Sequence, residues 1–385
     1  MNARRAHAKS RNGCAQCKTR KVKCDEQIPC SRCVKRGDKC SLAAIITPLS
    51  TGGASSVTGS RTHAQDDDVF TLSDISLFHR FSTTTCRYLA GPNLPSPWLD
   101  YIPELATKHK FLMQEMMAVA ALDLSINAAP TGEQVTANLE LARHHHSRGL
   151  AGLRIAISSH SAELIEAIWA CNTLLIPYYF ASTADVSSLL FRENSTEPAE
   201  WMTVLRGAAM LYLQYEQVLL SGPMRVHIQP YKTGLRVGAV VPPKTTPSDT
   251  HVDEMTTRLQ AYLESNATDS YTDARKLDTM AEVFKFLRSC FQISDRGDFL
   301  SIKSASLSFI AVIPPHFFEL MGRKDQAAMV IMAFWCVLLN RAEKGTWWMQ
   351  FRKVRNMLQF IADMLEPDTR ALIQWPLDQL LAPED

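Results

Sequence analysis

From about residue 69 onward, apolar residues recur every three to four positions, the spacing that places side chains on one face of an α-helix. In the first such segment Ser73 is the predicted N-terminal cap, and Leu77, Phe81, Thr84 and Tyr88 fall near one face. The pattern therefore predicts an amphipathic helix at the start of this region.

The same periodicity continues through the rest of the chain. Residues Lys110–Ile126 are apolar over much of the helix circumference, as expected for a helix buried on several sides. The run Val241–Asp249, "VPPKTTPSD", interrupts the pattern before helices resume. Further periodic stretches are 138–157, 163–180, 200–215 and 274–291. Strands do not alternate with helices and no repeat of fixed period is visible, so we predict a large all-α domain over residues 69–385.

The longest uninterrupted apolar stretch is Met329–Leu339, which has 11 residues. Crossing a bilayer takes ~20 residues, so this stretch is expected to be a buried helix and no membrane span is predicted. Residues 1–13 are basic and lack the apolar segment of a secretory signal. We therefore expect an intracellular protein whose thiols are reduced, and this argues against disulfides.

Residues 41–68 are rich in Ser, Thr and Gly and show no periodicity, which indicates a flexible linker. A flexible coil of 28 residues spans on the order of 30 Å. The linker contains no heptad pattern of a coiled coil. Homodimerisation would therefore have to use the helical domain, and the alternative is a monomer on one DNA half-site.

The formal net charge of +2 hides a strong asymmetry along the chain. Residues 1–40 hold 12 of the 41 Lys and Arg residues and three of the 39 acidic ones, so their charge of +9 leaves −7 on the remainder. A basic N-terminal region on an acidic body indicates a polyanionic partner for that region alone.

Six cysteines fall within 27 positions of this basic region, in two copies of the spacing C-x2-C-x6-C. They are Cys14, Cys17, Cys24, Cys30, Cys33 and Cys40. Tetrahedral zinc takes four ligands, so six thiolates satisfy two zinc ions if two of the thiolates bridge both metals. The internal repeat predicts one bridging cysteine from each half. Three disulfides and a thiol-rich metal buffer are the alternatives, and the reducing compartment and the ordered basic run respectively count against them.

These residues resemble the fungal zinc binuclear cluster (Zn₂Cys₆) DNA-binding domain. The likeness covers about residues 10–41 and includes the six cysteines, Pro29 and the basic run between Cys17 and Cys24. The resemblance implies two structural Zn²⁺ ions, with Cys14 and Cys30 as the bridging ligands. We accordingly divide the N-terminal region into a basic flexible arm (1–13) and a zinc cluster domain (14–40).

Basic residues Lys18–Lys23 are expected on a short helix that follows Cys17, where they can enter the major groove of double-stranded DNA. Lys and Arg suit the O6 and N7 acceptors of guanine. By resemblance, Arg20 and Lys21 read a CGG-type triplet, and the sequence leaves open which of the two contributes more.

The remaining basic residues are expected to contact phosphate, which supplies affinity and register and carries no sequence information. These residues are Lys18 and Lys23 from the first half of the cysteine repeat, and Lys35 and Arg36 from the second half.

The helical region resembles the regulatory domain of the sterol uptake control type of fungal transcription factors. The likeness rests on the phrases "LFHRFSTTTCRYL", "LMQEMMAVAALDLS", "WMTVLRGAAML", "VIMAFWCVLLNRAEKGTWWMQ" and "IQWPLDQLL", spread over about residues 70–381. Because this family includes receptors that hold a sterol in an apolar pocket, the resemblance implies that a small apolar ligand is an alternative partner.

Other features of the helical region favour structural roles. The run His144–His146 cannot converge on one ion, since consecutive helical residues point ~100° apart, and it is expected on a solvated or partly packed helix face. Trp347 and Trp348 are expected in the core. The four remaining cysteines have no paired spacing and are expected to be small buried apolar residues. They are Cys86, Cys171, Cys290 and Cys336.

The chain contains none of the motifs G-x-S-x-G, H-E-x-x-H, G-x-x-x-x-G-K-[ST] and G-x-G-x-x-G, and it is not expected to be an enzyme. We predict a nuclear, zinc-dependent, sequence-specific regulator of RNA polymerase II transcription whose helical domain serves dimerisation, co-regulator contact or ligand sensing. The alternative is a receptor for an apolar, sterol-like ligand whose DNA binding is conditional. A helical enzyme with a DNA-binding module is a third interpretation.

Overall fold

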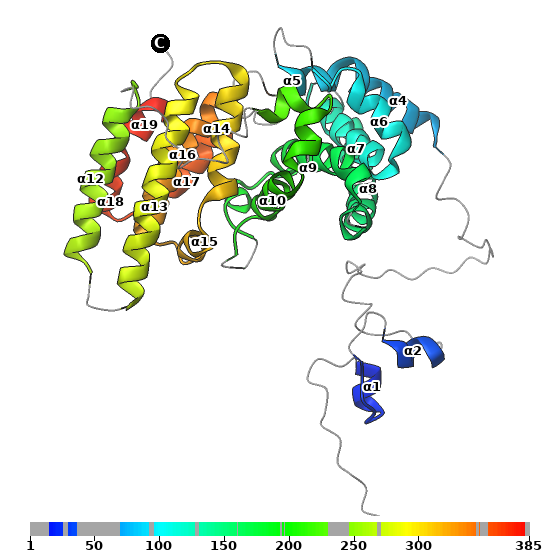
Figure 1. The fold of residues 1–385 in the computed structure, drawn as a ribbon, viewed down its shortest axis with the longest axis horizontal. Coiled ribbons are helices and arrows are strands. Elements are labelled where there is room, and N and C mark those ends of the chain that lie inside the picture. The colour runs from blue at the N-terminus through cyan, green and yellow to red at the C-terminus, as the bar shows by residue number, and fades with distance from the viewer. Residues whose placement is uncertain are drawn as a thin grey trace, which may run out of the picture. The chain divides into compact units, whose positions relative to one another are not determined.

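The computed structural model describes residues 15–25, 30–36, 70–91, 96–127, 131–159, 161–192, 195, 197–229, 246–267, 271–343, 346 and 353–381. The chain separates into two compact units, residues 1–69 and residues 70–385 (Figure 1). The predictions that fall on other residues concern the arm 1–13, Cys14, Cys40, the linker 41–68, Trp347 and Trp348; they lie outside the described residues.

In its described residues, 15–25 and 30–36, the first unit contains two short helices, α1 (Ala15–Thr19) and α2 (Ser31–Arg36). Four cysteines and the partly buried Val22 form its packed centre. A centre made almost entirely of thiols is too small to fold by apolar burial, so this unit depends on another source of stability.

The second unit is helical in its described part, and its only described β pairing is an isolated bridge between Phe191 and Pro198. The prediction of an all-α domain is confirmed. Its N-terminal half contains α4 (Leu72–Arg80), η1 (Phe81–Thr85), α5 (Cys86–Ala90), α6 (Tyr101–Lys108), α7 (Lys110–Asn127), α8 (Gly132–Ser158), η2 (Ala162–Leu164), α9 (Ile165–Ser182), η3 (Val186–Leu189) and α10 (Glu200–Ser221). Its C-terminal half contains α12 (Asp249–Ser265), α13 (Tyr271–Ser294), α14 (Phe299–Val312), α15 (Pro315–Gly322), α16 (Gln326–Glu343), α17 (Lys353–Met364), α18 (Pro367–Arg370), η4 (Ala371–Ile373) and α19 (Gln374–Leu381).

The first helix of this unit begins two residues earlier than predicted. Thr71, and not Ser73, is the N-cap of α4, because Thr71 and Asp74 form a reciprocal capping box. The Thr71 hydroxyl accepts from the Asp74 N–H at 3.2 Å, and the Asp74 carboxylate accepts from the Thr71 N–H at 2.8 Å. Both N–H groups are otherwise without a helical partner. A capping box at Ser73 would need a carboxylate or amide side chain three positions later, where the chain has Ser76.

A π-helical turn, η1, follows α4 and changes which residues face the core. The prediction placed Leu77, Phe81, Thr84 and Tyr88 on one face, but the residues buried after Phe81 are two adjacent pairs, Thr85 with Cys86 and Leu89 with Ala90. A π turn holds more residues than an α turn, so the inward-facing positions fall four apart and Thr84 and Tyr88 are only partly buried.

The π turn brings Thr85 to a buried carboxylate. The side chain of Asp123 in α7 is fully buried and accepts from the Thr85 hydroxyl at 2.6 Å and the Arg80 Nε at 2.8 Å. A third donor, the Asn127 amide, lies 2.7 Å away on the same helix. This network joins α4 and η1 to α7.

One buried helix lies at the centre of each half of the helical unit, α7 in the N-terminal half and α16 in the C-terminal half. Helix α7 packs against α8 and α9, and every residue from Met116 to Leu122 is buried. Helix α16 packs against α13, α14, α17 and α19 (Figure 1), and residues Ala327–Leu339 are all buried. The apolar run Met329–Leu339 is therefore a core helix, as predicted.

Helix α9 is the most membrane-like segment of the described chain. Residues 162–182 are long and apolar enough to cross a membrane by length and composition, and 72% of the most apolar window is buried inside the structure. A bent pair, α14 with α15, passes the same test only if it is taken as one broken span. Core helices of this kind satisfy length and composition tests, because they are apolar on several faces.

The C-terminal end of α9 is capped by a lysine from a distant helix. The Lys353 ammonium of α17 donates to the carbonyl oxygens of Phe180, Ala181 and Thr183, the last at 3.0 Å. These carbonyls include groups that no helical N–H reaches, so Lys353 ties α17 to α9.

The histidine run lies on a partly packed face, where His145 and His146 have different partners. The His145 Nδ1 is 2.7 Å from the Gln114 amide oxygen. The His146 ring stacks on Tyr178 at 3.6 Å, and its Nδ1 lies 3.0 Å from the Glu115 carboxylate. His144 remains exposed, so the expected partly packed face is observed.

The four cysteines of this unit are also fully buried, as predicted.

Candidate zinc centre and nucleic-acid interface

Four of the six predicted metal ligands come together in the first unit. Cys17, Cys24, Cys30 and Cys33 are each at most 3% exposed, and none of these four forms a disulfide. The Cys17 and Cys30 sulfur atoms lie 3.8 Å apart. Two thiolates bound to one tetrahedral zinc at ~2.3 Å would lie roughly 3.8 Å apart, so this pair already has the spacing of zinc ligands.

Cys30 belongs to two groups of candidate ligands. The sulfur atoms of Cys17, Cys30 and Cys33 all lie within 4.8 Å of one another, and ligand atoms of Cys24, Asp25 and Cys30 do the same. One thiol shared by two groups is the arrangement that a bridging ligand requires. The Cys33 N–H also points at the Cys30 sulfur at 3.5 Å, which favours the thiolate form.

Asp25 has a structural role that explains its place beside these cysteines. Its two carboxylate oxygens accept from the Ser31 N–H, at 3.1 and 3.3 Å. Ser31 is the first residue of α2, so the carboxylate satisfies an orphan N–H at the helix start and complements the helix dipole.

The basic run Lys18–Lys23 lies on a helix only in part, because Lys18 and Thr19 belong to α1 and the other four residues follow it. Helix α1 ends at Thr19, and Lys21 has φ +55°, the left-handed conformation that ends many helices. The Lys21 N–H donates to the Lys18 carbonyl at 3.1 Å and the Val22 N–H donates to the Cys17 carbonyl at 3.0 Å. This Schellman pattern stops the helix because it satisfies the last carbonyls.

The helix end leaves the predicted DNA-contacting residues on the surface. Lys18, Arg20, Lys21 and Lys23 around α1 are exposed, and so are Lys35 and Arg36 at the end of α2.

A cleft of about 410 Å³ lies between α1 and α2 and divides these residues into two groups. Its lining includes two of the predicted zinc ligands and consists of Gln16, Cys17, Arg20, Val22, Ser31, Arg32, Cys33, Lys35 and Arg36. None of the described residues that line it is acidic, and Lys18, Lys21 and Lys23 do not line it. Arg32 was not predicted as a site residue. The available signal was its spacing of four residues from Arg36, which places both on one side of a helix.

Comparisons with known proteins agree with the cysteine geometry. Residues 12–48 match the fungal Zn(2)-Cys(6) binuclear cluster domain, and residues 76–235 match the fungal specific transcription factor domain. The chain therefore combines a fungal Zn(2)-Cys(6) binuclear cluster domain with a fungal specific transcription factor domain. Transcription factor families, and not enzyme families, thus account for both matched regions.

Similar proteins cover different parts of this Zn(2)-Cys(6) chain. A Zn(2)-C6 fungal-type transcription factor afumD of Aspergillus fumigatus is 28% identical over 221 residues, 54% of this chain and 56% of that protein. Sterol uptake control protein 2 of Saccharomyces cerevisiae is 30% identical over 146 residues, 36% of this chain and 15% of that protein. Sterol uptake control protein 2 of Candida albicans is 64% identical over 33 residues, 8% of this chain and 5% of that protein. The aligned part spans about half the length of the first relative and much less of the others.

A Zn(2)-Cys(6) domain holds two zinc ions, and the described thiols fit that role. When bound, the metals supply structural cross-links, since thiolates fill their tetrahedral positions. Within the described residues, Cys17, Cys24, Cys30 and Cys33 would hold them. The assignment of Cys14 and Cys40 as the remaining ligands, and of Cys14 as the second bridge, stays a prediction.

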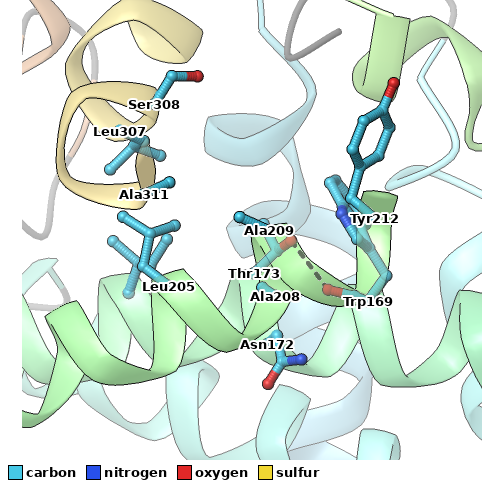
Figure 2. Close-up of a pocket in the computed structure, with 11 residues that line it drawn as sticks. Trp169, Asn172, Thr173, Leu205, Ala208, Ala209, Tyr212, Leu307, Ser308 and Ala311 are labelled. Atoms are coloured by element: carbon cyan, nitrogen blue, oxygen red, sulfur yellow. Dashed lines mark hydrogen bonds between the residues drawn. The ribbon is translucent and has the colours of Figure 1, made fainter. Parts of the chain in front are cut away.

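The helical unit contains a small pocket of about 40 Å³ between α9, α10 and α14. Figure 2 shows Leu307 and Ala311 of α14 opposite Leu205 of α10, and the hydrogen bond from the Thr173 hydroxyl to the Trp169 carbonyl. A water needs ~10–15 Å³ by this measure, so the pocket holds only a few waters and is far below the size of ligand pockets.

A larger groove of about 720 Å³ runs between α8, α9 and α10. Its lining is mainly apolar and includes Leu153, Leu175, Val204, Met210 and Leu213. Met210 is 67% exposed and Leu213 is 51% exposed, so the groove is open to solvent.

Proposed function

We propose that this protein is a zinc-dependent, sequence-specific DNA-binding regulator of RNA polymerase II transcription that acts in the nucleus. The observation that carries the proposal is the placement of exposed Arg20 and Lys21 directly after a helix held by Cys17 and Cys30. The family and the basic charge of the region support it.

In this mechanism Cys17, Cys24, Cys30 and Cys33 would hold the zinc ions, which would supply structural cross-links. Helix α1 and the turn that ends it then enter the major groove as one rigid basic unit. Arg20 and Lys21 are placed to reach the O6 and N7 acceptors of a CGG-type triplet. The other basic residues neutralise phosphates on either side and set the register. Because binding releases counterions, affinity should fall steeply as salt rises.

The deciding experiment is the selection of random duplex DNA by the full-length protein, with zinc and again with a chelator. Enrichment of a CGG-type triplet only with zinc is the expected result. One enriched triplet would indicate a monomer, and two would indicate a homodimer formed through the helical domain. If no sequence were enriched under either condition, the proposal would be wrong.

A second candidate function is a receptor for a small apolar ligand. The 720 Å³ groove favours it, since ligand sites typically measure ~300–1,000 Å³ and are largely apolar. Gly207 lines the groove, and an added Cβ there meets no atom within 4 Å, so the side chain of Gly207→Phe starts in open space and should occupy part of the groove. Gly132, which also has open space around it, lies outside the groove lining and gives the matched control Gly132→Phe.

The test measures binding of a radiolabelled sterol and of palmitate to the full-length protein. Saturable binding that Gly207→Phe abolishes and Gly132→Phe preserves would establish the receptor function. Equal binding by both variants would place the ligand elsewhere and remove the groove as its site.

A further inference from the structure

The outward face of α10 forms one wall of the 720 Å³ groove and presents apolar side chains to solvent. Met210 is 67% exposed and Leu213 is 51% exposed, and Ile157 on the α8 side of the groove is 39% exposed. The charged residues of the lining are Arg154 and Glu200, one of each sign. An exposed apolar patch with a polar rim is typical of a surface that binds another protein.

Gly207 lies in the middle of this face, and no packing contact within the described chain explains it. Glycine is less favourable than alanine inside a helix. Two helical glycines of α8, Gly149 and Gly152, are required by close packing, because an added Cβ would lie 2.9 Å from the Glu115 carboxylate and 2.7 Å from the Phe111 Cβ, respectively. At Gly207 an added Cβ meets no atom within 4 Å. A glycine in open space on an apolar face allows a backbone from outside the protomer to approach closely.

Five of the residues that α10 contributes to the groove are spaced symmetrically about this glycine. Val204 and Met210 lie three residues before and after Gly207, and Glu200 and Gln214 lie seven residues before and after it. These separations are close to one and two helical turns, so the five residues share one side of the helix. If a second α10 crosses at Gly207 in the antiparallel direction, Val204 meets Met210 of the second copy, and Glu200 meets Gln214 of the second copy.

We propose that the α10 face, defined as Glu200, Val204, Gly207, Met210 and Gln214, binds a second copy of this chain, with the two α10 helices antiparallel and crossing at Gly207. Apolar side chains then pack together beside the crossing point. At each end of the contact a Glu200 carboxylate accepts from a Gln214 amide. This is the self-complementarity that a two-fold dimer requires.

The dimer does not depend on the proposed function, which enters only through the two triplets that a dimer would select. A second copy and a small ligand would compete for the same groove. The open α10 face suits the second copy better, because small-molecule pockets typically bury about 70–90% of the ligand surface.

Sedimentation equilibrium of the zinc-loaded full-length protein without DNA, over a wide range of protein concentration, measures dimerisation. The wild type should be a mixture of monomer and dimer. Gly207→Phe should weaken dimerisation by about tenfold or more, because the new ring holds the two helices apart. Gly132→Phe is the matched control and should leave dimerisation unchanged, since Gly132 is also a helical glycine in open space but lies outside the groove lining.

An exchange of the two polar residues tests the antiparallel arrangement. Gln214→Glu places two carboxylates opposite each other at both ends of the contact and should weaken dimerisation by roughly two- to tenfold. Adding Glu200→Gln again places an amide opposite each carboxylate, so the double variant should recover wild-type dimerisation. Glu200→Gln alone pairs two amides and should stay close to the wild type. Circular dichroism should show the wild-type helix content for every variant, which excludes misfolding as the cause of a lost dimer.

Three results would overturn the inference. A wild type that remained monomeric at every concentration would mean that the α10 face binds something other than a second copy. A dimer that Gly207→Phe left intact would use another surface. A double variant no stronger than Gln214→Glu alone would exclude the antiparallel arrangement. None of these measurements uses DNA, so a failure of the proposed function would not change them.

Discussion

Lys21 adopts a backbone conformation that glycine adopts far more readily. Its φ of +55° places it in the left-handed region, where the side chain of an L-residue crowds its own backbone at a cost of roughly 1–2 kcal/mol. Strain of this kind persists where the surrounding structure enforces it and where the side chain is needed. Here the Schellman hydrogen bonds hold Lys21 in the left-handed conformation. In the proposed function its side chain is needed to contact DNA.

Substitution of Lys21 can separate the strain from the recognition. Lys21→Gly should stabilise the zinc cluster by up to about 1 kcal/mol, because the strain is removed. Lys21→Ala keeps the strain and should leave the stability nearly unchanged. Both variants should lose triplet preference equally, since both lack the ammonium. Slower zinc release to a chelating dye would report the stabilisation, and equal release rates from the two variants would contradict it.

His227 is the residue whose ionisation should matter most to the helical unit. It is 4% exposed, and its Nε2 lies 2.7 Å from the Ser96 hydroxyl oxygen. Burial, with a smaller effect from the Lys303 charge, lowers the pKa of His227 to about 4. The unfolded chain has a histidine pKa near ~6.5, so the folded state favours the neutral ring.

Stability should therefore be lost as pH falls from about 6.5 toward 4, because the unfolded chain takes up the proton first. Between pH 7 and pH 5 the His227 contribution amounts to about 2 kcal/mol. Urea unfolding of the wild type and of His227→Gln across this range isolates it, because His145, whose pKa burial also lowers, is present in both proteins. Identical pH dependence of the two would refute the assignment.

At the scale of elements, the buried carboxylate of Asp123 fixes the start of the helical unit. It holds Thr85 of the π turn and Arg80 of α4 against α7. Asp123→Ala leaves the partly buried Arg80 without this partner and should cost about 3–5 kcal/mol. Urea denaturation measures the loss.

Thr71→Ala is the control for the Asp123 prediction, since it removes only the exposed cap of the same helix and should cost about 1 kcal/mol. A similar cost for both variants would mean that the Asp123 network adds nothing beyond helix formation.

The existence of most helices could be predicted from apolar spacing, but their details could not. Phe81 and Leu77 face the core as the spacing predicts, whereas the π turn moves the later positions to Thr85 and Leu89. The segment "FSTTTC" contains no local signal of a π turn. The turn is stabilised by the Asp123 carboxylate, which lies 38 residues along the chain from Thr85. Tertiary contacts of this kind override local periodicity.

The zinc site was the most predictable part of the molecule because ligand spacing is local. Four cysteines meet as their repeat predicts, although the helix carrying Cys17 starts before it and ends sooner than expected. The cleft that contains Arg32 could not be predicted, because it depends on how α1 and α2 face each other.

For the whole molecule, two compact units predict two independent responses to metal removal. A chelator should unfold the first unit and abolish DNA binding, because its described core is made of thiols and Val22. The thermal unfolding of the helical unit should not change, since among the described residues the groups with metal-ligand geometry occur only at Cys17–Cys33.

Thermal unfolding followed by circular dichroism, combined with DNA binding before and after chelation, measures both responses. Zinc should restore binding, and magnesium, which prefers oxygen ligands, should not. A lower melting temperature of the helical unit after chelation would show that the two units are coupled.

The length of uninterrupted apolar runs does not identify α9 as the most membrane-like segment, because polar residues such as Asn172 and Thr173 interrupt its apolar run. Its burial by neighbouring helices has a consequence for synthesis on the ribosome. Helices α7 and α8, which cover part of α9, precede it in the chain, whereas α10 is completed 39 residues after α9 ends, at Ser221. At ~5–20 residues per second this interval lasts roughly 2–8 s. During those seconds the part of the α9 surface that α10 later covers is exposed on the nascent chain, and this surface is apolar enough to resemble a membrane-insertion signal. Early pairing of α7 with α8 should bury part of α9 and so favour its folding over insertion into a membrane.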